Sequence, residues 1–182
     1  EDERIYEWWY QREPGGGAYL DYCCYGANLA TWYLDEAPTA AYGLRGNFNS
    51  LYGEVEDYAT VTVQYPDTIA ILEGTWASKA SGVAHGPIVY GNEGTIVVKP
   101  DCVEIHRDRN SLEPSEVITD AKMPKGRATL GEEVIHHLDT GDPIHPTLDL
   151  DLNMRAMGIL DAGLRSCESG KLEPIYDETY NG

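Results

Sequence analysis

Three polar side chains near the start of the chain are spaced so that they could share one site. Asp21, Tyr25 and Asn28 stand at positions i, i+4 and i+7 of a stretch without proline. Residues at these spacings lie on one face of a helix, so a carboxylate, a phenol and an amide would be aligned. A carboxylate can take up a proton, and a phenol donates a hydrogen bond at neutral pH and can relay a proton. The spacing predicts Asp21 and Tyr25 as catalytic candidates, with Asn28 as a substrate-binding residue beside them.

A run of three glycines, Gly15 to Gly17, precedes this stripe. Glycines lack side chains, so a ligand could approach the backbone amides at the start of the following helix. A structural interpretation also stays open. In that interpretation Asp21 only complements the helix dipole in the first turn, and Tyr25 fills space.

Other residues with reactive side chains form no recognised motif. The five histidines give neither an HExxH motif nor a Cys/His zinc finger, so no metal site is expected. The segment after Asp149 begins like a calcium loop, but Met154 stands where glycine is needed and Leu160 where the bidentate glutamate would be. Neither a GxGxxG nor a Walker motif is present, so we expect no nucleotide site within the chain.

The helix that would carry the polar stripe follows from hydrophobic periodicity. Between residues 18 and 34, Cys23, Ala27, Ala30 and Leu34 recur at spacings of four, three and four. This pattern predicts a helix with a small apolar face, suited to close packing on a sheet. The polar stripe would lie on the opposite face.

A period of two replaces the helical period further along the chain. Segments 58–65 and 68–76 alternate and are joined by a turn at Pro66-Asp67, which predicts a β-hairpin. Further strands are expected at 39–48, 87–90, 95–99, 102–107 and 116–119. Because short turns join these strands, the sheet should be antiparallel.

Two more helices are expected after the strands. Thr129 and Glu132 have the spacing of a capping box, and they would open a helix that runs to about residue 138 and stops at Gly141. A longer helix is expected over about 148–169. The predicted fold class is α+β: a largely antiparallel β-sheet with helices packed on one face.

The second face of that sheet would also carry apolar residues. The candidates are Val61, Val63, Ile69 and Ile71, depending on the register. An uncovered apolar sheet face indicates a partner surface, most simply a homodimer.

Composition narrows the classes of partner. The chain has 182 residues, with 13 Lys and Arg against 31 Asp and Glu, and a formal charge of −18. This balance makes nucleic acids and anionic membranes poor partners, and no apolar run approaches the ~18 residues of a membrane span. The four cysteines form no CxxC motif, which favours free thiols in a reducing compartment, the cytoplasm.

Several motifs occur in a fixed order along nearly the whole chain: Trp8-Trp9, Gly15 to Asp21, Glu73 to Trp76, Tyr90 to Thr95, His145 to Thr147, Gly158 to Ala162 and Ser166 to Lys171. Together they resemble the C-terminal domain of Gfo/Idh/MocA oxidoreductases. The resemblance implies a two-domain enzyme whose N-terminal Rossmann domain binds NAD or NADP and supplies a catalytic lysine. Residues 1–182 would be a single C-terminal domain for substrate binding and oligomerisation. The Rossmann domain is absent from the chain, which would be inactive alone.

The resemblance also implies roles for individual residues. Family members commonly place Asp and His four residues apart on the helix after the glycines. Asp21 matches the Asp, and Tyr25 stands where His is usual, similar to the variant seen in glucose–fructose oxidoreductase. Asp21 would position a sugar hydroxyl or the lysine, and Tyr25 would handle the hydroxyl proton.

Further substrate-binding residues are expected around this pair. Trp9, Tyr10 and Arg12 would line a sugar pocket, and His85 would reach it from a loop. Two alternatives stay open. One is a non-catalytic dimerisation or ligand-binding module derived from the family, in which Tyr25 records lost catalysis. The other is a stand-alone isomerase or hydrolase that uses Asp21 and Tyr25 unaided.

Overall fold

A computed structural model describes residues 7–49, 53–78, 86–119 and 122–176. The chain divides into two compact units, and each is described by itself. One unit comprises Glu1–Lys79 with Pro143–Gly182, and the other comprises Ala80–Asp142. Among the described residues, no helix combines the length and the hydropathy that a bilayer crossing requires.

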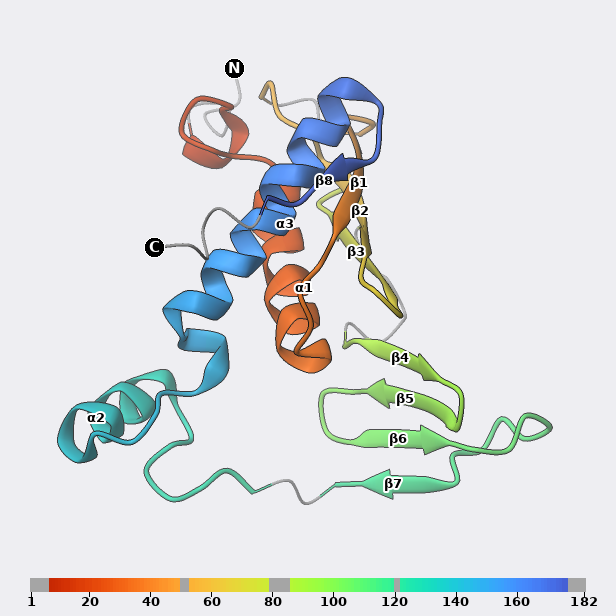
Figure 1. The fold of residues 1–182 in the computed structure, drawn as a ribbon, viewed down its shortest axis with the longest axis vertical. Helices are drawn as coiled ribbons and strands as arrows, with labels where there is room; N and C mark the ends of the chain where they lie inside the picture. The colour runs from red at the N-terminus through yellow and green to blue at the C-terminus, as the bar shows by residue number, and fades with distance from the viewer. Residues whose placement is uncertain (1–6, 50–52, 79–85, 120–121, 177–182) are drawn as a thin grey trace. The chain divides into compact units, whose positions relative to one another are not determined.

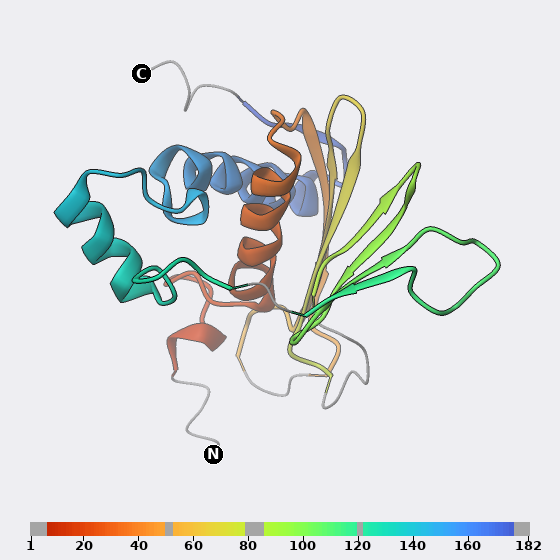
Figure 2. The ribbon, with the colours of Figure 1, turned by 90° about the horizontal axis from the view of Figure 1, so that it is seen from below.

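The first unit is built on a four-stranded antiparallel sheet. Its strands lie in the order β3-β2-β1-β8, with β1 at Ala40–Gly46, β2 at Tyr58–Gln64, β3 at Ile69–Thr75 and β8 at Glu173–Pro174. The predicted hairpin of β2 and β3 is confirmed. Helices α1 and α3, described next, cover one face of this sheet (Figure 1, Figure 2).

Helix α1 spans Ala18–Leu34, as the periodicity predicts. Its small apolar face is also confirmed, because Cys23 and Ala27 are fully buried in the core and Ala30 and Leu34 pack partly buried against it. Burial raises the pKa of the Cys23 thiol to about 12, so this side chain behaves as a small neutral core residue.

Helix α3 spans Leu150–Ser169 and begins later than the sequence predicts. Residues Pro146–Leu148 form a short 3-10 helix, η3, instead of the first turn of α3. The carboxylate of Asp149 then accepts hydrogen bonds from the Asp151 and Leu152 amides at 2.9 and 3.1 Å. This N-cap satisfies two amides that would otherwise lack partners and sets the start of α3.

Helix α3 approaches strand β1 closely because Gly43 of β1 has no side chain at the contact. A Cβ on Gly43 would lie 2.3 Å from the carbonyl oxygen of Gly163. The Gly43 amide donates to Ser166 Oγ at 3.0 Å. The Tyr19 phenol of α1 donates to the Leu160 carbonyl of α3 at 2.8 Å, and burial raises the pKa of Tyr19 so that the phenol remains a donor.

The sheet register decides which apolar residues remain uncovered. Val61 pairs with Leu72, and both point to the helix-covered face and are buried. Val63 is buried on the same face, whereas Ile69 and Ile71 are 65% and 74% exposed on the other. The prediction of an open apolar face therefore holds for the two isoleucines. It is wrong for Val61 and Val63, because a strand turns alternate residues to opposite faces.

The second unit contains a separate antiparallel sheet in the order β4-β5-β6-β7. Its strands are β4 at Ile88–Gly91, β5 at Gly94–Val98, β6 at Val103–His106 and β7 at Glu116–Ile118. The predicted α+β class with antiparallel pairing is confirmed, although the strands form two sheets and not one. The alternation of residues along a strand shows which side chains share a face. It does not show which strands pair when a long connection separates them, so the sequence did not reveal the division into two sheets.

Helix α2 of the second unit, Leu130–Thr140, begins and ends as predicted from its caps. The Thr129 side chain accepts from the Glu132 amide, and the Glu132 side chain accepts from the Thr129 amide. Gly141 closes the helix in the left-handed conformation, with φ of 75°. Every buried hydrophobic side chain among the described residues nevertheless belongs to the first unit, which therefore holds the core.

Candidate functional site

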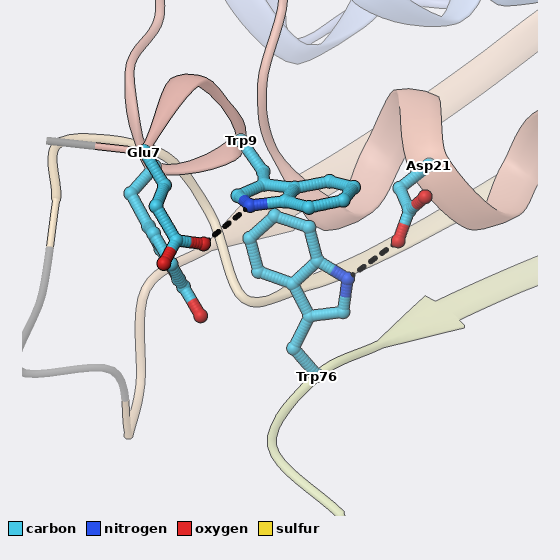
Figure 3. A pocket seen from close by; sticks show the side chains of 5 residues that line it. Glu7, Trp9, Asp21 and Trp76 are labelled. Carbon is cyan, nitrogen blue, oxygen red and sulfur yellow. Dashed lines mark hydrogen bonds between the residues drawn. The ribbon is translucent and has the colours of Figure 1, made fainter. Parts of the chain in front are cut away.

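A cavity of about 300 Å³ lies at the start of α1 (Figure 3). Three elements border it: the short 3-10 helix η2 (Trp8–Tyr10), the first turn of α1, and the segment that follows β3. Its lining consists of two carboxylates and three aromatic rings, contributed by Glu7, Trp9, Tyr10, Asp21 and Trp76. Three of these residues, Trp9, Tyr10 and Asp21, are among the residues that the sequence predicts for a site.

Each carboxylate in the cavity is held by the N–H of an indole ring. Trp76 Nε1 donates to Asp21 Oδ2 at 2.8 Å, and Trp9 Nε1 donates to Glu7 Oε2 at 2.7 Å (Figure 3). The Tyr10 ring meets the Trp76 ring edge-on, with 5.6 Å between their centroids. Among the described residues, Asp21 Oδ1 has no hydrogen-bond partner, so it is available to a ligand hydroxyl.

The glycine run shapes the wall of the cavity. The Gly16 amide donates to the Gln11 carbonyl and the Gly17 amide to the Trp9 carbonyl, both at 2.9 Å. A Cβ on Gly16 would lie 2.2 Å from the Trp9 carbonyl oxygen. Only a residue without a side chain lets the backbone wrap this tightly around η2, so the glycines position Trp9.

The prediction that a ligand approaches the amides of this run is wrong, because those amides already have partners within the chain. The Gly15 amide donates to the Arg12 carbonyl at 3.0 Å. The Ala18 amide donates to the Glu56 carbonyl, and the Tyr19 amide to Glu56 Oε1, both at 3.1 Å. With the two glycine bonds described above, every amide from residue 15 to residue 19 has an internal acceptor.

Glu56 acts as the cap of α1 although it lies far from that helix in the sequence. Gly17, at the N-cap position, has no side chain that could cap the helix, and its φ of 113° is accessible mainly to glycine. A Cβ on Gly17 would lie 2.1 Å from Glu56 Oε1. Glu56 is buried and forms an ion pair with Arg45 at 3.5 Å. This arrangement fixes the start of α1 and therefore the position of Asp21.

The structure does not bring the whole polar stripe into the cavity. Tyr25 is 66% exposed and does not line the cavity. Asn28 lies about 10 Å further along the helix axis than Asp21, given a rise of ~1.5 Å per residue. Its amide donates to Asn153 Oδ1 at 2.9 Å and to the Thr147 carbonyl at 3.1 Å, which ties α1 to α3 and η3. The expectation that the three groups converge is therefore wrong.

Of the other predicted binding residues, Arg12 does not line the cavity. The Arg12 guanidinium donates to the Glu54 carbonyl at 2.9 Å and holds the turn after η2 against the segment before β2. His85 lies outside the described residues.

Glu7 and Trp76 were not predicted as site residues. Trp76 ends the Glu73 to Trp76 motif, so its place directly after a strand was the available signal. Glu7 gave no signal other than its position next to Trp8-Trp9. Trp76 reaches the cavity through a contact with Asp21, which is distant in sequence, whereas Glu7 is held by Trp9, two residues away.

A larger cavity, of about 440 Å³, lies at the other end of α1. Trp32, Asp35, Asp149 and Arg155 contribute to its lining, and no residue predicted for the site does. Asp35 ends α1 in the left-handed conformation with φ of 49°, and Asp149 caps α3. The two acidic residues that line this larger cavity, Asp35 and Asp149, therefore have structural roles at the ends of helices.

Comparison with known proteins identifies the family. A family model described as "GFO/IDH/MocA C-terminal domain" matches residues 1–97. A comparison with curated proteins gave no match.

Solved structures with the same fold are oxidoreductases of low sequence identity. An aldose-aldose oxidoreductase from Caulobacter crescentus, complexed with glycerol, has a TM-score of 0.72 at 21% identity, and the match covers 93% of this chain and 51% of that one. An oxidoreductase domain protein from Kribbella flavida has a TM-score of 0.75 at 13% identity, covering 94% and 55%. A levoglucosan dehydrogenase in complex with NADH and levoglucosan has a TM-score of 0.74 at 13% identity, covering 96% and 56%. The chain thus spans about half the length of these structures.

Proposed function

Because the chain belongs to the GFO/IDH/MocA C-terminal domain family, we propose that it is the substrate-binding and oligomerisation domain of an NAD(P)-dependent oxidoreductase. The substrate is a sugar or a sugar-like hydroxyl or carbonyl compound. The observation that carries the proposal is the cavity in which Trp76 holds the carboxylate of Asp21 beside the rings of Trp9 and Tyr10. The names of two structural neighbours, an aldose-aldose oxidoreductase and a levoglucosan dehydrogenase, support the substrate class.

The chemistry of the cavity suits a sugar. A sugar ring presents C–H groups on its faces and hydroxyls at its rim. The faces of Trp9 and Trp76 offer apolar surface, and the carboxylates of Glu7 and Asp21 offer acceptors for hydroxyl protons. A binding site of this kind needs apolar side chains and a few well-placed polar groups, and the aromatic rings and carboxylates of the lining supply residues of both kinds.

In the proposed reaction Asp21 positions the reacting hydroxyl or the lysine of the cofactor domain. Its Oδ2 is held by Trp76, so Oδ1 can accept the proton of a substrate hydroxyl without reorientation. Tyr25 lies one helical turn further, about 6 Å along the axis. Its exposed phenol handles the hydroxyl proton once the cofactor domain covers this side of α1.

The cavity at the start of α1 does not fit a dinucleotide. Its pyrophosphate would need unengaged amides or cations, yet the amides of residues 15–19 have internal acceptors and the lining of the cavity is acidic and aromatic. The proposal therefore assigns NAD or NADP to a Rossmann domain outside these residues. The chain alone would have no turnover.

The open face of the first sheet supports the oligomerisation part of the proposal. Tyr42, Leu44, Ile69 and Ile71 are exposed on this face, and Leu44 and Ile71 are 58% and 74% exposed. A second copy of the chain would cover them. Replacing Ile71 by Lys should then lower the apparent mass in sedimentation. All four cysteines are free thiols, which supports a reducing compartment such as the cytoplasm.

The experiment that tests the enzymatic role uses the complete two-domain enzyme. NAD(P)-dependent oxidation of aldoses is measured for the unmodified protein and for Asp21→Ala. A positioned acid–base or orienting group typically contributes ~10²–10⁴-fold, so kcat/KM should fall by that factor. Asp67→Ala, in the turn between β2 and β3, is a matched control and should leave kcat/KM unchanged. A loss of less than about tenfold for Asp21→Ala would refute its role.

A second candidate function is a non-catalytic module for dimerisation or ligand binding. The position of Tyr25 favours it, because this phenol lies outside the cavity that contains Asp21. The two functions differ in one measurement. The complete protein oxidises an aldose with NAD or NADP if it is an enzyme, and shows no turnover with any aldose tested if it is a module.

A further inference from the structure

The cavity at the start of α1 has a charge pattern that the proposed function leaves unexplained. Of its five lining residues, Glu7 and Asp21 are acidic and the other three are aromatic (Figure 3). No Lys, Arg or His among the described residues lines it. We infer that this cavity selects uncharged or cationic polyhydroxylated ligands and rejects anionic ones such as sugar acids and sugar phosphates, with Glu7 as a second specificity-determining residue. The inference rests on the proposed function, because it concerns the same cavity.

Both negative charges are held in place. The indole N–H of Trp9 fixes Glu7 at 2.7 Å, and that of Trp76 fixes Asp21 at 2.8 Å. An ionised carboxylate accepts hydrogen bonds but donates none. A ligand hydroxyl or ammonium group can therefore donate to either residue. A ligand carboxylate or phosphate would meet two like charges and gain no hydrogen bond from them.

Two arginines lie near this end of α1, but neither neutralises the negative charge of the cavity lining. The Arg12 guanidinium is directed to the Glu54 carbonyl and does not line the cavity. Arg45 forms an ion pair with Glu56, the residue that caps α1. Each cation thus has a structural partner.

The helix start offers no anion site either. A helix N-terminus normally attracts anions through its unpaired amides. Here Glu56 accepts from the Ala18 and Tyr19 amides and brings its own negative charge to that point. The formal charge of −18 for the whole chain adds a long-range repulsion of anionic ligands.

The test compares three sugars that differ only at carbon 6. D-Glucose carries a hydroxyl there, D-glucuronate a carboxylate, and 6-amino-6-deoxy-D-glucose an ammonium group at neutral pH. Their binding to the 182-residue protein is measured by calorimetric titration at low and at high salt. D-Glucuronate should bind more weakly than D-glucose. We expect a loss of about two- to fivefold in affinity for each protein carboxylate, Glu7 or Asp21, that the ligand carboxylate faces. The amino sugar should bind at least as tightly as D-glucose.

The variant Glu7→Gln isolates the contribution of Glu7. The amide oxygen of glutamine can still accept the indole N–H of Trp9, so the change removes the charge and keeps the hydrogen bond. The affinity ratio of D-glucose to D-glucuronate should fall by about two- to fivefold. Glu13→Gln, an exposed acid in the turn after η2 that does not line the cavity, should leave the ratio unchanged. In the unmodified protein, high salt should bring the affinity ratio of D-glucose to D-glucuronate closer to one, because salt screens exposed charges.

Equal or tighter binding of D-glucuronate would overturn the inference and leave sugar binding intact. An unchanged ratio in Glu7→Gln would overturn the role of Glu7. If none of the three sugars binds, the selectivity is refuted. In that case the Asp21→Ala measurement on the complete enzyme still decides separately whether the proposed function holds.

Discussion

The two ends of helix α1 both border a cavity, but their polar residues are engaged in different ways. At the start, Asp21 accepts one hydrogen bond, from Trp76, and its second oxygen has no partner among the described residues. At the other end, Asp149 accepts hydrogen bonds from two amides as the cap of α3, and Asp35 is itself the left-handed residue that ends α1. The comparison shows that a polar lining alone does not indicate a site. The acceptors must also remain available after the helix ends have been satisfied.

The middle of the helix supports the same conclusion. Asn28 belongs to the same polar stripe as Asp21, yet its amide is bound to Asn153 and to the Thr147 carbonyl. What lies opposite each turn of the helix decides whether a polar residue serves packing or binding.

The largest expected effect concerns Tyr25, which belongs to neither cavity. In the complete enzyme, Tyr25→Phe should lower kcat/KM by ~10²–10⁴-fold, because the variant lacks the phenolic proton donor. The melting temperature should not change, since the side chain is 66% exposed. Steady-state kinetics and thermal denaturation check these expectations. An unchanged kcat/KM would show that Tyr25 has no catalytic role and that only the cavity with Asp21 is functional.

The next effect concerns the start of the helix. Gly17→Ala should destabilise the protein by about 2–4 kcal/mol, from backbone strain at φ of 113° and the loss of the Glu56 cap. Urea denaturation measures the free energy of unfolding. Gly131→Ala is a control, because a Cβ there meets nothing within 4 Å and Gly131 lies inside α2. A loss below about 1 kcal/mol for Gly17→Ala would mean that Glu56 does not fix this end.

The tie between α1 and α3 should contribute less. Asn28→Ala should lower the free energy of unfolding by about 1–3 kcal/mol, because it leaves the Asn153 and Thr147 oxygens without this donor. Substrate affinity should not change, since Asn28 does not line the cavity. A change in affinity without a change in stability would restore Asn28 as a binding residue.

At the far cavity, Asp149→Ala removes the cap of α3. We expect a loss of about 1 kcal/mol in the free energy of unfolding, typical for an N-cap. Asp149→Asn should retain most of the stability, because an amide oxygen can also accept from the Asp151 and Leu152 amides. If both variants bind sugars less well, the far cavity is a binding site and the contrast between the two ends fails.

The smallest effect concerns the packed face of α1. Burial raises the pKa of Cys23 to about 12, so this thiol ionises more readily in the unfolded chain than in the folded one. The buried neutral thiol contributes its full stabilisation below the pKa of 9.0 that applies to the unfolded chain. This stabilisation is lost as the pH rises toward 12. The difference at about pH 9.5 is below ~1 kcal/mol. Urea denaturation between pH 8 and 10 should show a shallower decline for Cys23→Ala than for the unmodified protein.

Local patterns in the sequence predicted local structure well. The spacing of Cys23 and Ala27 predicts the buried face of α1, and the capping box of Thr129 and Glu132 predicts the start of α2. The alternation on either side of Pro66-Asp67 predicts the hairpin of β2 and β3. These features depend on residues within a few positions of one another, whose hydrogen bonds and periodicity are set by backbone geometry.

The site could be predicted only in part, for the same reason. The presence of Asp21 and of aromatic residues before it was visible in the sequence, and both lie in the cavity. The failure of Asn28 to join them was not visible, because its partner Asn153 lies far along the chain. The role of the glycine run was also not visible, because its amides donate to carbonyls of the turn before it, and Glu56 accepts the next two amides from a distant loop.

The amino-acid sequence by itself determined the helices, the strands and the polar stripe, since each follows from interactions between near neighbours along the backbone. Only the tertiary structure decided that the strands divide into two sheets, that Ile71 and not Val61 is uncovered, and that Trp76 holds Asp21 at an open cavity. These outcomes depend on contacts between segments distant in sequence. The stability of such contacts depends on how whole elements pack, which no local pattern encodes.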